Sequence, residues 1–106
     1  MLSRGNFTQI LDSLMSHKGV YAVVIASAEG FPLTFRSRDG NFSADDAERT
    51  AALFSALVGR AQNAVRQIDR GEVNFFTIDI TTGEILVALE DEYVVIAIRD
   101  KKVNPV

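Results

Sequence analysis

The stretch that decides the fold is Gly19-Val20-Tyr21-Ala22-Val23-Val24-Ile25-Ala26-Ser27-Ala28-Glu29-Gly30-Phe31-Pro32-Leu33-Thr34-Phe35. Two apolar, β-rich runs are joined here by a small-residue turn at Ala28-Glu29-Gly30, which predicts a tight hairpin. Residues 20–26 are apolar at nearly every position, so we expect the first strand to be covered on both faces inside a sheet. Pro32 cannot donate a ladder hydrogen bond, which places it on an edge strand or at a strand's start. The stretch therefore predicts a three-layer domain.

Periodicity and turn residues predict the remaining elements on either side of this hairpin. Ser43 followed by Asp46 has the spacing of a capping box and predicts the start of a long helix. The expected elements are a short helix over 7–15, the hairpin, a turn at 39–41, a long helix over 43–68, and strands over 72–80, 84–89 and 93–99. The predicted order is α-β-β-α-β-β-β in a single domain over 1–106.

Composition excludes several classes of protein. The net charge of −3 comes from interspersed acids and bases without a basic run, so we expect no nucleic-acid partner. The longest apolar run is less than half of the roughly 20 residues that a membrane-spanning helix needs, so no membrane insertion is expected. The N-terminus lacks the apolar region of a secretory signal, which favours a cytoplasmic location.

The long helix is apolar over a wider arc than one sheet face needs. One stripe along the helix predicts contact with the sheet, and it consists of Ala47, Ala51, Phe54, Val58, Ala61, Val65 and Ile68. A second row beside the stripe contains Leu53, Leu57 and Ala64 with Thr50 and Arg60 among them, and the opposite side carries small residues at Ala52, Ala56, Gly59 and Asn63. One interpretation is that the second row flanks the core and the small residues are exposed helix formers. We favour the other, in which Leu53 and Leu57 contact the same helix of a second copy across a two-fold axis.

No catalytic constellation stands out, and we expect a protein that is not an enzyme. His17 is the one histidine and cysteine is absent, so neither a metal site nor a cofactor is expected. The run Glu90-Asp91-Glu92 is typical of a solvated turn. None of the glycines lies in a phosphate-binding loop, so the chain is not expected to be a P-loop nucleotide hydrolase. The arginines of the long helix fit a solvated surface better than an arginine finger.

The order of elements, the phrase Gly19 to Leu33, the alanine-rich long helix and the closing strand together resemble the roadblock domain family. That family includes roadblock-type dynein light chains and prokaryotic regulators of small GTPases. The resemblance implies an α+β fold, a five-stranded antiparallel sheet with the long helix on one face and the short N-terminal helix on the other. Many prokaryotic members carry a third helix after the last strand. This chain runs only about seven residues past Arg99, so we expect that helix to be absent and the face shared with the first helix to be undercovered.

The resemblance also implies a homodimer, or a heterodimer with a related chain. The long helices would pair across the two-fold axis and the strand over 73–80 would pair edge to edge. The expected dimer interface consists of Leu53, Leu57, Arg60, Ala64, Val73, Phe75 and Phe76. Such pairing would protect an edge strand that is otherwise prone to aggregation.

The function that these features predict is a dimeric interaction module that binds and regulates or scaffolds a Ras-like small GTPase. Its expected GTPase contact lies on the polar and small-residue side of the long helix, around Glu48, Ala52, Ala56 and Gly59. Two alternatives remain open: a structural adaptor subunit of a larger assembly, as the dynein light chains are, and a small-ligand sensor that uses the uncovered sheet face.

Overall fold

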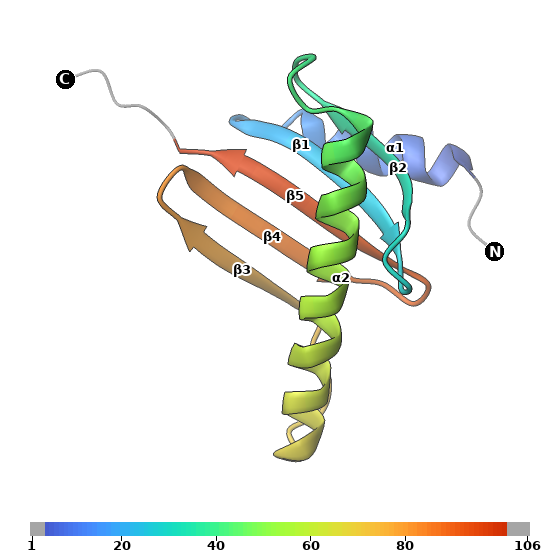
Figure 1. Cartoon of the computed structure of the whole chain (residues 1–106), viewed down its shortest axis with the longest axis vertical. Coiled ribbons are helices and arrows are strands. Elements are labelled where there is room, and N and C mark those ends of the chain that lie inside the picture. The colour runs from blue at the N-terminus through green and yellow to red at the C-terminus, as the bar shows by residue number, and fades with distance from the viewer. Residues whose placement is uncertain (1–3, 102–106) are drawn as a thin grey trace.

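The computed structural model describes residues 4–101, and its elements follow the predicted order (Figure 1). They are α1 (Arg4–Met15), β1 (Val20–Ser27), β2 (Pro32–Ser37), α2 (Ala44–Gln67), β3 (Phe75–Ile80), β4 (Gly83–Leu89) and β5 (Tyr93–Asp100). The strands form one antiparallel sheet in the order β2-β1-β5-β4-β3. β1 therefore lies inside the sheet, as its unbroken apolar run predicts, while β2 and β3 are the two edges. Pro32 begins edge strand β2, where its missing N–H does no harm.

The two helices lie on opposite faces of the sheet and make it the middle of three layers (Figure 1). Alternate residues of each strand supply the two cores, because successive side chains point to opposite faces. The α2 side is built from residues such as Val24, Val87 and Ile96, which are fully buried, together with Ala47 and Ala51 of α2. The predicted α+β fold is confirmed.

The α1 side has a separate core made by the other set of strand residues. Leu11 of α1 is buried among Val23, Ile25 and Val95. Phe7 meets Tyr93 edge to face, with ring centroids 5.2 Å apart. An ion pair between Asp12 of α1 and Arg36 of β2 also ties this helix to the hairpin.

The start of α2 has the capping chemistry that the sequence predicts, and its end is capped by backbone hydrogen bonds. The Ser43 hydroxyl accepts the Asp46 backbone N–H at 3.2 Å, and the Asp46 carboxylate accepts the Ser43 backbone N–H at 2.8 Å. The helix ends at cap residue Ile68, whose N–H bonds to the carbonyl of Ala64 at 3.3 Å. Asp69 then takes a left-handed backbone with φ of 57°. The prediction of a helix over 43–68 therefore counted the two cap residues.

The C-terminal part of α2 extends past the sheet (Figure 1). Ala47, Ala51, Phe54 and Val58 contact the α2-side core, but Ile68 is 68% exposed. The prediction that the whole apolar stripe covers the sheet is therefore wrong for its last turns. At about 1.5 Å per residue, a helix of this length is simply longer than the layer beneath it.

Two further predictions concern the chain after α2. β3 begins at Phe75 instead of residue 72, and Val73 lies in the connection that leads into the strand. Among residues 4–101, no helix follows β5. Over the described part of the chain, the α1 face therefore carries one helix.

Candidate dimer interface and outer surface of α2

One flank of α2 presents apolar side chains that the fold leaves uncovered. Leu53 is 62% exposed and Leu57 is 39% exposed, and Arg60 and Ala64 continue the row as exposed residues on the projecting part of the helix. We call these four residues the leucine flank. The structure brings them together on one side of α2, as the sequence predicts, because they recur at helical spacing.

The β1–β2 turn covers the opposite flank of α2. A Cβ on Gly30, whose φ is +97°, would lie 3.4 Å from Cα of Ala52. The Ser55 hydroxyl donates a hydrogen bond of 3.4 Å to the carbonyl of Ser27 in the same hairpin. At position 52 the backbone that comes close to α2 is therefore the chain's own β1–β2 turn.

This contact determines which way the leucine flank faces. Figure 1 shows the β1–β2 turn on one side of α2, and β3 and β4 on the other. Since the turn meets the Ala52 side, the leucine flank faces the other way: Leu53 borders a hollow with Tyr21 and Phe42, and the flank continues from there along the side of α2 that faces β4 and β3. The sheet there presents Phe76, Ile85 and Ile98, which pack against the core but are only partly buried. An apolar shelf thus extends from α2 toward the sheet edge.

Edge strand β3 borders this shelf and, among the strands of residues 4–101, pairs only with β4. Its other edge offers unpaired backbone groups, which is the usual template for pairing with another strand. Phe76 belongs to the α2-side core, so its neighbour Phe75 points to the α1 side, where it is 63% exposed. The predicted interface residues therefore do not form one patch, because Phe75 and Leu57 lie on opposite faces of the same sheet.

Val73 is placed by a contact that the sequence did not predict. Its backbone N–H donates to Oε1 of Gln62 at 2.7 Å, which joins the connection before β3 to α2. Arg66 and Glu72 form an ion pair of 3.1 Å beside it. Glutamine is common on helix surfaces, so nothing in the sequence marks this residue.

The predicted GTPase contact residues all lie on the surface. Glu48, Ala52, Ala56 and Gly59 are exposed along the outer side of α2, and Ala56 lies one turn from both Leu53 and Arg60 of the leucine flank. A Cβ built on Gly59 would have no atom of another element of the described chain within 4 Å. Of the four, Ala52 also contacts the β1–β2 turn, so a partner placed here would meet the hairpin as well as the helix.

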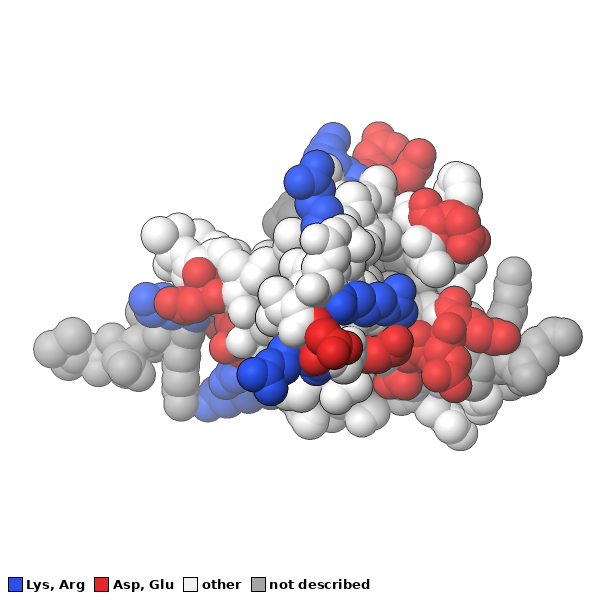
Figure 2. Space-filling model, turned by 90° about the horizontal axis from the view of Figure 1, so that it is seen from below, with Lys and Arg blue, Asp and Glu red and all other residues white. Residues whose placement is uncertain are grey.

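Acidic side chains gather on one side of the molecule (Figure 2). It is the side of the β1–β2 and β4–β5 turns, which are neighbours because Ser27 pairs with Tyr93. Glu29 lies exposed in the first turn and Glu90, Asp91 and Glu92 in the second. Burial, and then the charges of Glu90 and Asp91, raise the pKa of Tyr93 above its ordinary value. The predicted solvated turn is confirmed.

The described residues hold no group of three or more histidine or acidic side chains that could bind a metal ion. His17 is exposed after the end of α1. Neither α1 nor α2 combines the length with the apolar character that crossing a membrane requires.

Comparison with known proteins identifies the class. The sequence profile of the Roadblock/LC7 domain matches residues 7–100, and the chain belongs to that family. The fold is similar to the Roadblock/LC7 domain from Streptomyces avermitilis, with a TM-score of 0.77 at 17% identity over 91% of this chain and 79% of that one.

Two proteins named MglB are similar in the same way. Myxococcus xanthus MglB has a TM-score of 0.78 at 14% identity, over 93% of this chain and 79% of its own. The gliding protein MglB from Thermus thermophilus has a TM-score of 0.76 at 11% identity, over 88% of this chain and 70% of its own. At these identities the likeness concerns the fold.

Proposed function

We propose that this protein is a dimeric interaction module that binds a Ras-like small GTPase and regulates or scaffolds it. The observation that carries the proposal is the position of the leucine flank beside a free edge strand. The leucine flank and the free edge of β3 lie next to one another. In an isologous dimer, a single two-fold axis would bring both surfaces into contact with their counterparts.

The geometry of the dimer follows from these two surfaces. β3 of one copy pairs antiparallel with β3 of the other, which removes the free edge from both sheets. Leu53 and Leu57 then meet the partner's α2, and the projecting turns of α2 reach across the two-fold axis. Phe75 lies on the other face of the joined sheet, near its counterpart, so its exposure is explained without assigning it to the helix contact.

The GTPase follows from the roadblock resemblance, and the outer side of α2 is where we place it. Glu48, Ala52 and Gly59 remain outside the proposed dimer contact because they lie on another side of the helix, and Ala56 borders it. A rigid two-fold platform regulates a GTPase only if it binds the two nucleotide states with different affinity. Preference for one nucleotide state therefore separates a regulator from an adaptor.

The first experiment is light scattering coupled to size-exclusion chromatography at micromolar protein. We expect the mass of two chains. Leu53→Asp is expected to give the mass of one chain, because it places a charge in the apolar contact, and its side chain is exposed enough to leave the fold intact. Glu48→Ala, on another side of the same helix, is the control and should remain dimeric. A mass of one chain for the unmodified protein would overturn the proposal.

The second experiment adds a purified Ras-like GTPase, loaded either with GDP or with a non-hydrolysable GTP analogue. Tighter binding of one nucleotide form supports the regulator. Equal binding of both forms supports the adaptor. Glu48→Arg is expected to weaken binding without changing the mass of the dimer, because it reverses a charge on this surface and lies on the side of α2 away from the leucine flank.

A further inference from the structure

The sheet has a second free edge, at β2. Among the described strands β2 pairs only with β1, and the proposed dimer uses the opposite edge, at β3. Just after β2, the Arg38 N–H bonds to the carbonyl of Tyr21 at 2.8 Å. Because bonding alternates along an antiparallel strand, Phe35 and Ser37 direct their N–H and C=O groups outward. The last part of β2 therefore presents backbone groups to which another strand can bond.

The start of this edge is irregular. The pairing with β1 shifts between Pro32 and Thr34, so Leu33 bulges out of the ladder and is 49% exposed. Bulges and proline protect an edge against long, flat pairing with another sheet. The regular part of β2 covers only residues 34–37, so the edge fits a short extended segment better than the sheet of a second copy.

A notch lies beside this edge, on the face of the sheet that carries α1. It has a volume of about 310 Å³ and is lined by Phe7 and Thr8 of α1 with Leu33 and Thr34 of β2. Thr34 points to this face, because its partner Ile25 belongs to the α1-side core. On a strand added next to β2, the side chain opposite Thr34 points the same way. That side chain enters the notch, and an apolar one suits the lining of Phe7 and Leu33.

The surroundings of the notch are acidic. Glu29 lies exposed in the turn that leads into β2. The acidic residues 90–92 precede Tyr93, whose ring meets Phe7 of the notch edge to face. Neither of these two turns contains a lysine or an arginine. Figure 2 shows the acidic side chains gathered on this side of the molecule.

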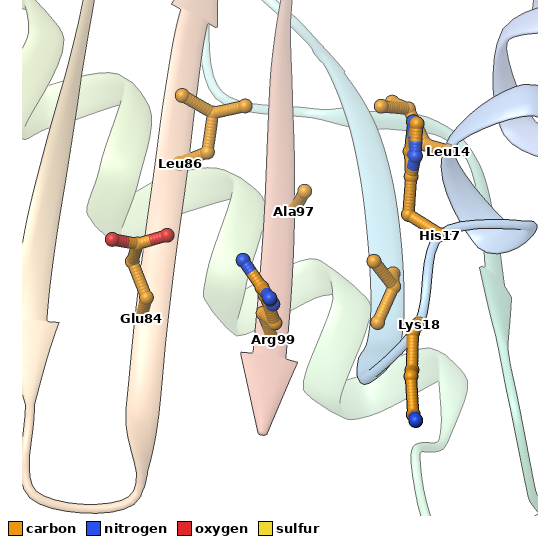
Figure 3. A pocket seen from close by; sticks show the side chains of 8 residues that line it. Leu14, His17, Lys18, Glu84, Leu86, Ala97 and Arg99 are labelled. Carbon is orange, nitrogen blue, oxygen red and sulfur yellow. The ribbon is translucent and has the colours of Figure 1, made fainter. Parts of the chain in front are cut away.

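The basic groups of the neighbouring surface lie elsewhere. Arg36 and Arg38 are at the far end of β2, and both already bond within the chain. On the other side of α1, a groove of about 440 Å³ toward β4 has Lys18 and Arg99 among its lining residues (Figure 3). The two hollows beside α1 therefore differ in charge. A segment that binds at the start of β2 needs positive charge there.

From these features we infer that the free edge of β2 binds a short, extended and basic segment of a partner protein. The segment adds an antiparallel strand, exchanges backbone hydrogen bonds with Phe35 and Ser37, and inserts one apolar side chain into the notch. Its lysines or arginines follow that side chain and face Glu29 and the β4–β5 turn, since an antiparallel strand ends where β2 begins. The site lies at the edge opposite β3, so the inference does not rest on the proposed dimer or on a GTPase.

The test uses a fluorescein-labelled peptide of about ten residues, the length of a long strand. Threonine and valine fill most positions, one leucine stands in the middle, and lysines follow it. Fluorescence anisotropy with the full chain is expected to show saturable binding that weakens in roughly 0.5 M salt. A second peptide with glutamate in place of lysine should bind at least about tenfold more weakly, because it meets the acidic turns.

Methylation of single peptide nitrogens distinguishes strand pairing from a purely electrostatic contact. The residue before the leucine lies opposite Phe35, so its N–H bonds to β2, and methylating that nitrogen should weaken binding at least about tenfold. The leucine's own N–H points away from β2. Methylating it is the matched control and should leave binding unchanged. Equal effects of the two methyl groups would overturn the inference, and this comparison needs no variant of the protein.

Variants of the protein locate the site. Glu29→Lys with Glu90→Lys is expected to weaken binding about fivefold, because it reverses the charge beside the notch. Both residues are exposed, so the change leaves the fold intact. The control, Glu72→Lys with Glu84→Lys, makes the same change of net charge near β3 and β4 and should stay within about twofold of the unmodified chain.

Absence of saturable binding, equal binding of the glutamate peptide, or unchanged binding by the variant at positions 29 and 90 would overturn the inference. A lower mass of that variant in light scattering would also overturn it, because a second copy of the chain would then occupy the edge.

Discussion

The backbone N–H of Val73 donates to the side-chain oxygen of Gln62 over 2.7 Å, and this bond links α2 to the chain that enters β3. The two parts of the proposed interface, a helix flank and a strand edge, come from different elements. Their relative position depends on the connection between them. The side chain of Gln62 therefore influences whether the flank of α2 and the edge of β3 can contact a partner at the same time.

Gln62→Ala is expected to lower the free energy of unfolding by about 1 kcal/mol, because it leaves the partly buried Val73 N–H without its acceptor. The same change should weaken the dimer, since β3 loses its tether to α2. Gln62→Glu keeps an oxygen at this position and is the control. Urea unfolding measures the stability of both variants and sedimentation measures their dimerisation. Equal losses of stability and of dimer in Gln62→Ala and Gln62→Glu would contradict the prediction.

Leu57→Asp is expected to give the mass of a single chain, because a desolvated charge in the helix contact is costly. Arg66→Ala, on the same helix, should change neither mass nor fold. Its ion pair with Glu72 is exposed on both sides, and such pairs contribute little. Analytical ultracentrifugation measures the mass of each variant in solution. A stable, dimeric Leu57→Asp would show that the contact uses another face of α2.

Gly83→Ala and Gly59→Ala should have opposite effects on stability. A Cβ at position 83 would lie 1.8 Å from the carbonyl oxygen of Arg99, so the β3–β4 turn has to move and we expect a loss of about 3 kcal/mol. At position 59 a Cβ meets no other element of the described chain within 4 Å, and alanine in the helix should add about 0.5–1 kcal/mol. Thermal and urea unfolding measure both. A neutral Gly83→Ala would contradict the packing of β4 on β5.

Asp46 should make stability depend on pH through the capping box. The hydrogen bond from the Ser43 backbone N–H, and then that from the Ser43 side chain, lower the pKa of Asp46 below its ordinary 3.8. The stabilisation is therefore present above about pH 4, where the unfolded carboxyl is ionised, and is lost as the pH falls through the lower folded value. Asp46→Asn should be less stable than the unmodified chain at neutral pH. The difference between their free energies of unfolding should become smaller in acid. Urea unfolding at several pH values between neutral and acid tests this prediction. A difference in free energy of unfolding that does not change with pH would exclude stabilisation by the ionised Asp46 carboxylate.

Much of the fold was predictable because its signals are local. The unbroken apolar run of β1 indicated an interior strand, Pro32 an edge position, and Ser43 with Asp46 the start of α2. Each depends on residues that are neighbours in the chain. The predictions were wrong where the apolar pattern of a segment continues beyond the layer on which the segment packs. Ile68 fits the apolar stripe of α2, yet the sheet ends before the helix does.

The candidate surfaces were predictable in part for the same reason. Helical spacing put Leu53 and Leu57 in one row. It could not tell that Phe75 faces the other side of the sheet from Leu57, because that follows from the pairing of β3 with β4. The contact of Gly30 with Ala52 joins a hairpin turn to a helix, and no periodicity within either segment contains it.

The sequence by itself determined which segments are helices and strands, their order, and which side of α2 is apolar, since these follow from propensity, capping and side-chain spacing within a segment. Only the tertiary structure decided how far α2 overlaps the sheet, which strand edges stay free, and that α1 leaves a groove beside β4. Those properties depend on the widths of layers and on contacts between residues far apart in the chain. Such distances are set when the elements pack against one another.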